Sequence, residues 1–180
     1  KIAAYQELGI NRISVGVQTL HPRPFETLGR IHSINQSLAA MTELQRSQFS
    51  NWTADLMFGL PHQTLAQLKI DTMRILEFGP KHISIYGLIL ENTTSFGKMF
   101  KANQAPLPDE EIEADMYEFL LTELPSRGYD NYEISNFAQS GYESQHNQAY
   151  WNGSNYLGLG LSAASLVAGQ RFAQTHNFSK

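Results

Sequence analysis

Polar side chains occur where buried strands of this chain are expected to run or end. Gln18 ends one apolar run, and Glu91 ends another. Asp55 lies inside a third apolar run, Trp52 to Phe58. Parallel strands that alternate with helices collect functional groups at their carboxyl ends. These three side chains are therefore candidates for contact with a ligand.

Asp55 has the most demanding position of the three. A carboxylate in an apolar strand is costly unless it is paired or hydrogen-bonded. Asp55 must therefore accept hydrogen bonds from some donor. The donor is either a hydroxyl or amine of a ligand, or a neighbouring loop that the carboxylate caps.

Arg30 lies in the segment Leu28 to His32, just before an expected helix. Its guanidinium could bind a ligand carboxylate through two hydrogen bonds, and the amide of Gln18 could supply further hydrogen bonds. Each has an ordinary alternative, a surface ion pair for Arg30 and a loop hydrogen bond for Gln18.

Strands and helices are predicted to alternate in the first half of the chain. Ser33 with Gln36, and Thr64 with Gln67, fit the capping-box pattern that begins a helix. The order strand, helix, strand, helix, strand indicates an α/β fold whose parallel sheet has right-handed crossovers. The predicted strands cover residues 12–17, 52–58 and 83–90, and a helix over 2–8 precedes them.

The second half of the chain has a different texture. Residues 92–108 are polar and indicate a connector, which places a domain boundary between Glu91 and Pro108. Asp109 is expected to cap a helix that Pro125 ends. A strand is predicted over 132–137 and short extended pieces over 141–169, in an accessory region that could extend the sheet.

Composition excludes several classes of protein. Among 180 residues, 42% are hydrophobic and 17% charged, as in globular proteins. A net charge of -4 argues against nucleic acid as a partner. The absence of cysteine excludes disulfides and thiolate metal sites within this stretch. No signal peptide or membrane span is recognisable, so we expect a cytoplasmic protein; without an initiator Met, we expect a fragment of a longer one.

Five motifs in order resemble the HemN/HemW group of radical S-adenosylmethionine (SAM) proteins. Asn11 to Gln18 resembles the fourth barrel strand, and the two segments Leu28 to His32 and Asp55 to Pro61 resemble the next two motifs. The remaining motifs are Tyr132 to Ala138, similar to the accessory-domain signature, and His146 to Trp151, similar to the H-N-x-x-Y-W motif of the HemW branch, followed by Tyr156 to Gly160.

The resemblance implies a fold and a SAM site. The fold would be a partial (βα) TIM-like barrel: residues 1–91 form its C-terminal half, 92–108 a connector, and 109–180 an incomplete α+β accessory domain. By the same resemblance Gln18, Arg30 and Asp55 contact SAM. Ile89, on the last strand, would touch the adenine through its backbone.

The resemblance also implies a haem site. The HemW branch is regarded as a haem chaperone, so haem or porphyrin and haem-accepting proteins become expected partners. His146 would be an axial ligand of the iron, within a motif that includes Asn147, Tyr150 and Trp151. The alternatives are a hydrogen-bonding loop histidine and aromatic rings that pack in the accessory core.

The chain departs from the family in two places. The family holds a [4Fe-4S] cluster with three cysteines in a C-x3-C-x2-C loop, which would lie upstream, so this chain supplies only part of the SAM pocket. The run Leu161 to Ser165 has no histidine and is closer to oxygen-independent coproporphyrinogen III oxidases. Three hypotheses stay open: a haem chaperone, that oxidase, and a barrel fragment without activity.

Overall fold

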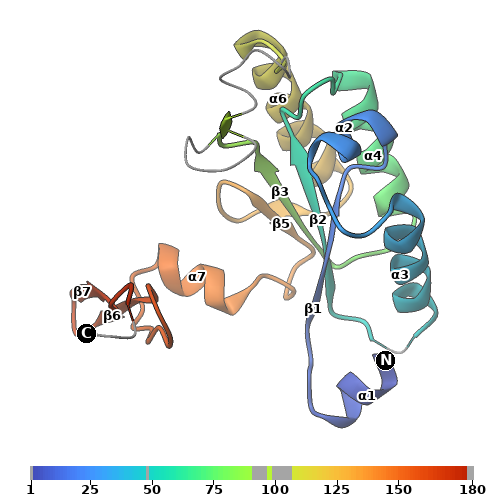
Figure 1. Ribbon diagram of the computed structural model, residues 1–180. Coiled ribbons are helices and arrows are strands. Elements are labelled where there is room, and N and C mark those ends of the chain that lie inside the picture. The colour runs from blue at the N-terminus through green and yellow to red at the C-terminus, as the bar shows by residue number, and fades with distance from the viewer. Residues whose placement is uncertain (1, 48, 91–96, 99–106, 178–180) are drawn as a thin grey trace. The chain divides into compact units, whose positions relative to one another are not determined.

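The computed structural model describes residues 2–47, 49–90, 97–98 and 107–177 (Figure 1). The chain divides into two compact units, Lys1–Tyr142 and Glu143–Lys180. Each unit is described by itself below.

The first unit is built on a five-stranded sheet with the order β1-β2-β3-β5-β4. β1, β2 and β3 are parallel, whereas β5 is antiparallel to both β3 and β4. This arrangement confirms the predicted α/β class with its parallel sheet. The strands are β1 (Ile13–Gln18), β2 (Trp52–Phe58), β3 (His82–Gly87), β4 (Asp130–Asn131) and β5 (Asn136–Ala138); the helices are α1 (Ile2–Glu7), α2 (Pro22–Thr27), α3 (Ile34–Arg46), α4 (Leu65–Leu76) and α6 (Glu110–Ser126).

The predicted helix starts are confirmed at α3, α4 and α6. The Ser33 hydroxyl accepts from the Gln36 backbone N–H at 3.2 Å, and the Gln36 side chain accepts from the Ser33 N–H at 2.8 Å. Thr64 forms the same reciprocal pair with Gln67. Asp109 accepts from the N–H of Ile112 at 2.9 Å. These bonds satisfy backbone donors that the first turn of a helix leaves free.

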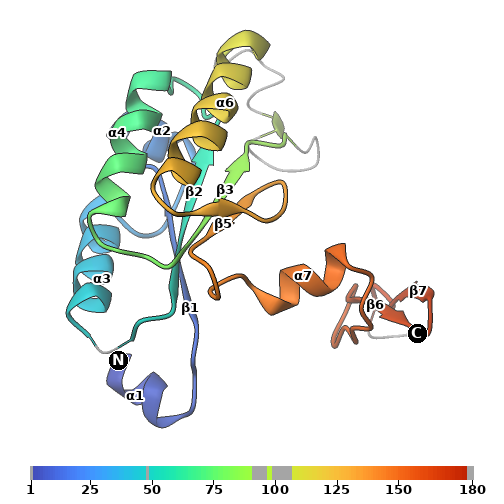
Figure 2. The ribbon, with the colours of Figure 1, turned by 180° about the vertical axis from the view of Figure 1, so that it is seen from behind.

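The helices α3, α4 and α6 cover one face of the sheet (Figures 1 and 2). Every second residue of β2 points into this layer and is buried, and the helices contribute apolar side chains to the same core. The intervening residues of β2 lie on the opposite face. The core side chains include Trp52, Ala54, Leu56 and Phe58 of β2, Met41 and Leu44 of α3, Leu68 and Ile75 of α4, and Met116, Leu120 and Leu124 of α6.

β3 ends earlier than predicted. It stops at Gly87 rather than at residue 90, so Ile89 lies beyond the strand, with 84% of its surface exposed. The reason is the end of its neighbour: Phe58 pairs with Gly87, and Gly59 then turns away with φ +70°. Residues after Gly87 therefore lack a strand on that side, and the placement of Ile89 on the strand was wrong.

The sequence predicted that Pro125 would end its helix, but the helix continues past it. Pro125 lies in the last turn of α6, which continues to Ser126. A proline so close to the end removes one backbone donor, and the end is closed by other donors: the N–H groups of Arg127 and Gly128 bond to the carbonyls of Leu124 and Pro125.

The strand predicted over residues 132–137 was wrong, because a turn separates β4 from β5. The Glu133 carboxylate accepts from the Ser135 N–H at 3.0 Å and from the Asn136 side chain. The Asn131 side chain donates to the Asn136 carbonyl at 3.2 Å. These polar side chains bond to the local backbone, which favours a turn over an extended strand.

Residues 109–142 belong to the same compact unit as the parallel strands. β5 pairs with β3, and α6 packs against α4 and β2. The first part of the expected accessory region, residues 109–142, therefore extends the sheet. Most of the expected connector, 92–108, lies outside the described residues.

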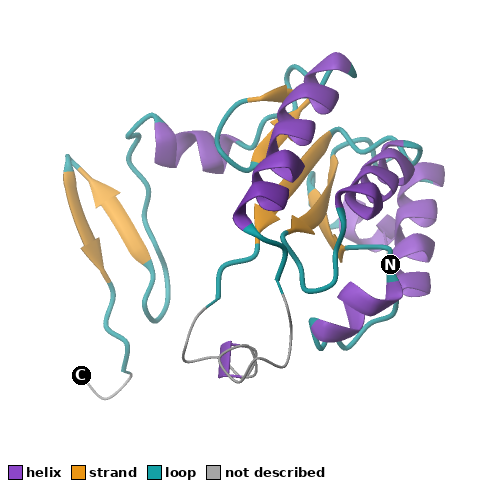
Figure 3. Ribbon diagram, turned by 90° about the horizontal axis from the view of Figure 1, so that it is seen from above, coloured by secondary structure: helices purple, strands orange, loops and turns teal. Residues whose placement is uncertain are grey.

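The second unit contains α7 (Gln145–Trp151) and the antiparallel pair β6 (Ala164–Val167) and β7 (Gln170–Ala173), which Figure 3 shows as a two-stranded ribbon. The prediction of short extended pieces here missed α7. The helix begins at Ser144, whose side chain accepts from the Asn147 N–H at 3.4 Å. In the part of the chain that the structure describes, no helix is both long and apolar enough to cross a membrane.

A buried carboxylate fixes the loop that follows β1. Asp71 of α4 is fully buried and accepts from the Thr19 hydroxyl at 2.6 Å and from the Leu20 N–H at 3.1 Å. His21 Nε2 lies 3.4 Å from the other carboxylate oxygen. Burial raises the pKa of Asp71, while these contacts act in the opposite direction. The loop that follows Gln18 is thus tied to α4.

Asp71→Ala should lower the free energy of unfolding of the intact protein by about 2–4 kcal/mol, because it leaves two buried donors without an acceptor. Chemical denaturation measures the change. Asp115→Ala, at an exposed position of α6, is the matched control and should change stability by less than about 0.5 kcal/mol. Equal stability of the two variants would contradict this role of Asp71.

Candidate functional site

The sheet face opposite the helices is polar. Gly16, Asp55 and Ser84 are paired across β1, β2 and β3, so they lie side by side on this face. Ser14, two residues before Gly16, shares the face. The carboxylate, two hydroxyls and one glycine thus form a band across the parallel strands.

Asp55 is hydrogen-bonded, as its position in an apolar strand requires. The Ser14 hydroxyl lies 2.8 Å and 2.7 Å from its two oxygens. Burial raises the pKa of Asp55, whereas hydrogen bonds from Ser14 and Ser84 and the charge of Arg12 lower it. The donors found are side chains of the neighbouring strands, so the carboxylate does not cap a loop.

Gln18 lies over Gly16, next to Asp55. Its backbone has φ +70°, which non-glycine residues rarely adopt, and β1 has an irregular register between Gly16 and Gln18. A Cβ added to Gly16 would stand 2.9 Å from Nε2 of Gln18. Only 8% of Gln18 is exposed, and its amide has no hydrogen bond to any described residue. A glycine at position 16 leaves the space that this amide fills.

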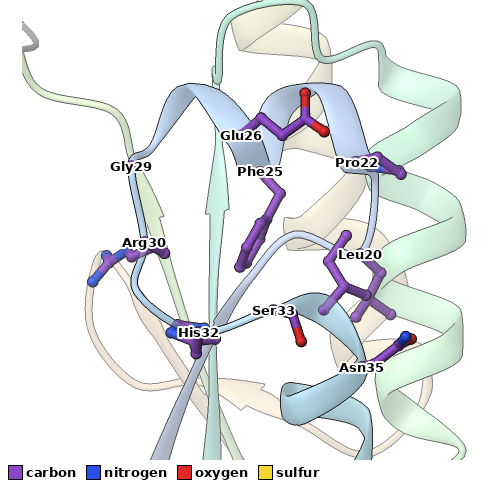
Figure 4. Close-up of a pocket in the computed structure, with 10 residues that line it drawn as sticks. Leu20, Pro22, Phe25, Glu26, Gly29, Arg30, His32, Ser33 and Asn35 are labelled. Atoms are coloured by element: carbon purple, nitrogen blue, oxygen red, sulfur yellow. The ribbon is translucent and has the colours of Figure 1, made fainter.

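Arg30 lines a different feature, a groove of about 590 Å³ between α2 and the start of α3. Figure 4 shows its guanidinium directed away from Leu20 and Phe25, which line the same groove. Arg30 is exposed and has no hydrogen bond or ion pair within the described ranges. Neither Gln18 nor Asp55 lines this groove. The structure brings Gln18 and Asp55 close together, and it places Arg30 at the groove beside α2 with its guanidinium directed out of that groove.

Two further residues of the polar face were not singled out from the sequence. Arg12 donates to the Thr53 hydroxyl at 3.0 Å and to the Tyr142 carbonyl at 2.9 Å, and burial lowers its pKa. His82 is 1% exposed and bonds to the Tyr132 hydroxyl at 2.7 Å. Burial and the charge of Arg12 lower the pKa of His82 to about 3, so it is neutral at pH 7.

The signal that could have found Ser14 and Ser84 is their spacing. Each is a hydroxyl residue between two apolar neighbours, Ile13 and Val15 for Ser14 and Ile83 and Ile85 for Ser84. That alternation places both on the face opposite the helices. Their proximity to Asp55 depends on the strand register, which no local pattern specifies.

In the second unit, His146 lies on α7 rather than in a turn. Its ring packs edge-on against Tyr150 with centroids 4.8 Å apart, and Tyr150 packs against Tyr156 at 4.4 Å. His146 is exposed, and Trp151 is 59% exposed. Asn147 lies between them on the helix and is half-buried. The motif therefore presents rings at the surface of this unit, which argues against the alternative of core packing for Trp151.

The residues present suit SAM and haem but not an iron–sulfur cluster. Carboxylate and amide groups match hydroxyl and amine partners, and an imidazole is a ligand of haem iron. The sequence contains no cysteine. Within the described ranges, no three His, Asp or Glu side chains are grouped so that they could hold a metal ion.

Comparison with known proteins agrees with the motifs. Residues 1–72 match the model of the radical SAM superfamily. The heme chaperones HemW of Lactococcus lactis subsp. lactis and of Bacillus subtilis are each 38% identical over 171 residues, or 95% of this chain. That alignment covers 45% of each relative, so the chain spans less than half of their length.

The fold is shared with a solved radical SAM enzyme, coproporphyrinogen III oxidase (HemN) from Escherichia coli. The TM-score is 0.79 over 99% of this chain and 44% of that one, at 21% identity. This likeness confirms the predicted partial barrel. By sequence, the chain is similar to the HemW heme chaperones and matches the radical SAM superfamily over residues 1–72.

Proposed function

We propose that this chain forms part of the SAM pocket of a radical SAM haem chaperone. The observation that supports this most is the half-buried Asp55 carboxylate beside the Gln18 amide, which has no hydrogen-bond partner among the described residues, on the sheet face opposite the helices. The cluster ligands would come from a segment outside these residues, since the chain has no cysteine.

Within this proposal each residue has a distinct partner on SAM. Asp55 accepts hydrogen bonds from the ribose hydroxyls, and Gln18 supplies hydrogen bonds through its amide. Arg30, whose guanidinium is free among the described residues, binds the carboxylate. Ile89 touches the adenine through its backbone. Bound SAM supplies radical chemistry when a reduced [4Fe-4S] cluster stands beside it.

Haem is the second proposed ligand. His146 is exposed on α7 and its ring packs against Tyr150. A haem that approaches from solvent could therefore coordinate an imidazole nitrogen of His146 through its iron. Tyr150 and the exposed Trp151 offer apolar ring surface for a porphyrin. The 38% identity with HemW relatives supports haem or porphyrin as cargo and haem-accepting proteins as partners.

An oxygen-independent coproporphyrinogen III oxidase is the second candidate. It is favoured by the run Leu161 to Ser165, which lacks a histidine, and by the fold shared with HemN. Conversion of coproporphyrinogen III to protoporphyrinogen IX by the full-length protein under anaerobic reduction would establish it. Haem binding without that conversion supports the chaperone, and neither activity would indicate an inactive barrel.

Asp55→Ala in the full-length protein should weaken SAM binding by about 1–3 kcal/mol, roughly 5- to 150-fold, because ligand hydroxyls lose their acceptor. Isothermal titration calorimetry measures the affinity. Asp115→Ala is the control and should bind like the native protein. Native affinity in Asp55→Ala would show that the carboxylate is only structural.

Gly16→Ala should weaken SAM binding roughly tenfold, about 1.4 kcal/mol, because the new Cβ displaces the Gln18 amide. The displaced group is the end of a flexible side chain, so the melting temperature of Gly16→Ala should equal that of the native protein. In a Gln18→Ala background the same substitution should have no further effect on affinity. An equal loss in both backgrounds would mean that Gly16 acts independently of Gln18.

His146→Ala should abolish or blue-shift the Soret band of the haem-loaded full-length protein and leave SAM affinity unchanged. Absorption spectroscopy after haem titration measures this. His176→Ala is the matched control, since His176 is another exposed histidine of the same unit. A Soret band identical in all three proteins would remove His146 as a ligand.

A further inference from the structure

The contact between Ser14 and Asp55 is unusual in its symmetry. Ser14 Oγ stands 2.8 Å from one carboxylate oxygen and 2.7 Å from the other. A serine hydroxyl has a single proton, so both oxygens share it. The hydroxyl therefore faces the carboxylate as a whole and restricts its rotation.

A second hydroxyl residue lies on the other side of Asp55. Ser84 is its register partner on β3, and the Ser84 side chain lowers the pKa of Asp55. A carboxylate offers about four acceptor positions. With one serine proton shared between the two oxygens, acceptor positions remain for a ligand.

Among the described residues, few charges surround Asp55 on this face. Arg12, which precedes β1, is the cation whose charge acts on the carboxylate. His82 of β3 is neutral at pH 7, and its Nε2 is bonded to the hydroxyl of Tyr132 in the β4–β5 turn. Arg12 itself is bonded to Asn51, Thr53 and Tyr142. Hydroxyl donors, rather than a direct ion pair, are thus the immediate partners of the carboxylate.

We infer that Ser14 is a positioning residue for Asp55: its hydroxyl orients the carboxylate and keeps it ionised, so that it can accept hydrogen bonds from two adjacent hydroxyls of a ligand. A protonated carboxyl would present a donor to such a diol and lose acceptor capacity. This inference rests on the proposed SAM site.

Electrostatics give the direction of the effect. Burial raises the pKa of Asp55, and the hydrogen bond from Ser14 is the largest of the influences that lower it. Removal of that hydroxyl therefore raises the pKa of Asp55 further. The consequence is a change in pH dependence as well as in affinity.

The first test is SAM affinity as a function of pH in the full-length protein. Ser14→Ala should bind roughly five- to tenfold more weakly at pH 7, and the acidic limb of its profile should move to higher pH. Part of the loss should disappear at alkaline pH, where Asp55 is ionised in both proteins. Ser14→Thr, which keeps the hydroxyl, should restore the native profile, and Ser50→Ala, at an exposed serine, should not alter it.

A loss in Ser14→Ala that is the same at every pH, or that Ser14→Thr fails to rescue, would overturn the positioning role while the SAM site stands. Failure of the native protein to bind SAM would instead overturn the proposed function. The two failures are therefore distinguishable. A second test of Ser14, which needs no ligand, keeps its role testable even if SAM does not bind.

That test is the pH dependence of unfolding. A carboxyl whose folded-state pKa is raised stabilises the fold at low pH, and this contribution is lost as pH rises through the folded-state pKa. Ser14→Ala, with the higher pKa, should therefore lose more stability than native protein as pH rises between the two values. The difference should vanish in an Asp55→Asn background. A difference that persists there would show that Ser14 does not act through Asp55.

Discussion

A carboxylate in the central strand of a parallel sheet is the constraint on which the rest of this structure depends. Asp55 lies between β1 and β3, and burial disfavours its charge. The sheet supplies Ser14 on one side and Ser84 on the other, with Arg12 as the cation of the face. Hydrogen-bond donors are therefore built into strands that are otherwise mostly apolar.

The crossovers explain why this polar band lies on the face opposite the helices. Right-handed connections place α3 and α4 on one face of the sheet, and α6 joins them there. The apolar residues of β2 alternate into that layer, so its intervening residues face the other way. Asp71 then ties the loop after β1 to α4 through Thr19 and Leu20. This contact stabilises the unusual backbone of Gln18 just before the loop.

Much of the fold could be predicted because its determinants are local. Ser33 and Thr64 mark helix starts through side-chain bonds that span three residues, and the apolar run of β2 coincides with the observed strand. One error arose where a distant partner decides, since β3 ends with its neighbour β2. A second arose from local side-chain bonds that the apolar pattern does not reveal: those around Glu133 form a turn where a strand was predicted.

The site follows the same division. Asp55 and Gln18 stand out in the sequence as polar residues within or after apolar strands, and the structure places them side by side. Their support by Ser14 and Asp71 joins segments 41 and 52 residues apart, which only register and packing define. Arg30 lines the groove beside α2 with its guanidinium directed outward, and its contact with SAM stays a prediction from the family motif.

The most direct test of the central claim is a crystal structure of the full-length protein with SAM bound. The account predicts both ribose hydroxyls within about 3 Å of the Asp55 carboxylate, the Gln18 amide bonded to the same ligand, and Ser14 still in contact with Asp55. SAM bound elsewhere, with Asp55 bonded only to Ser14 and Ser84, would contradict it.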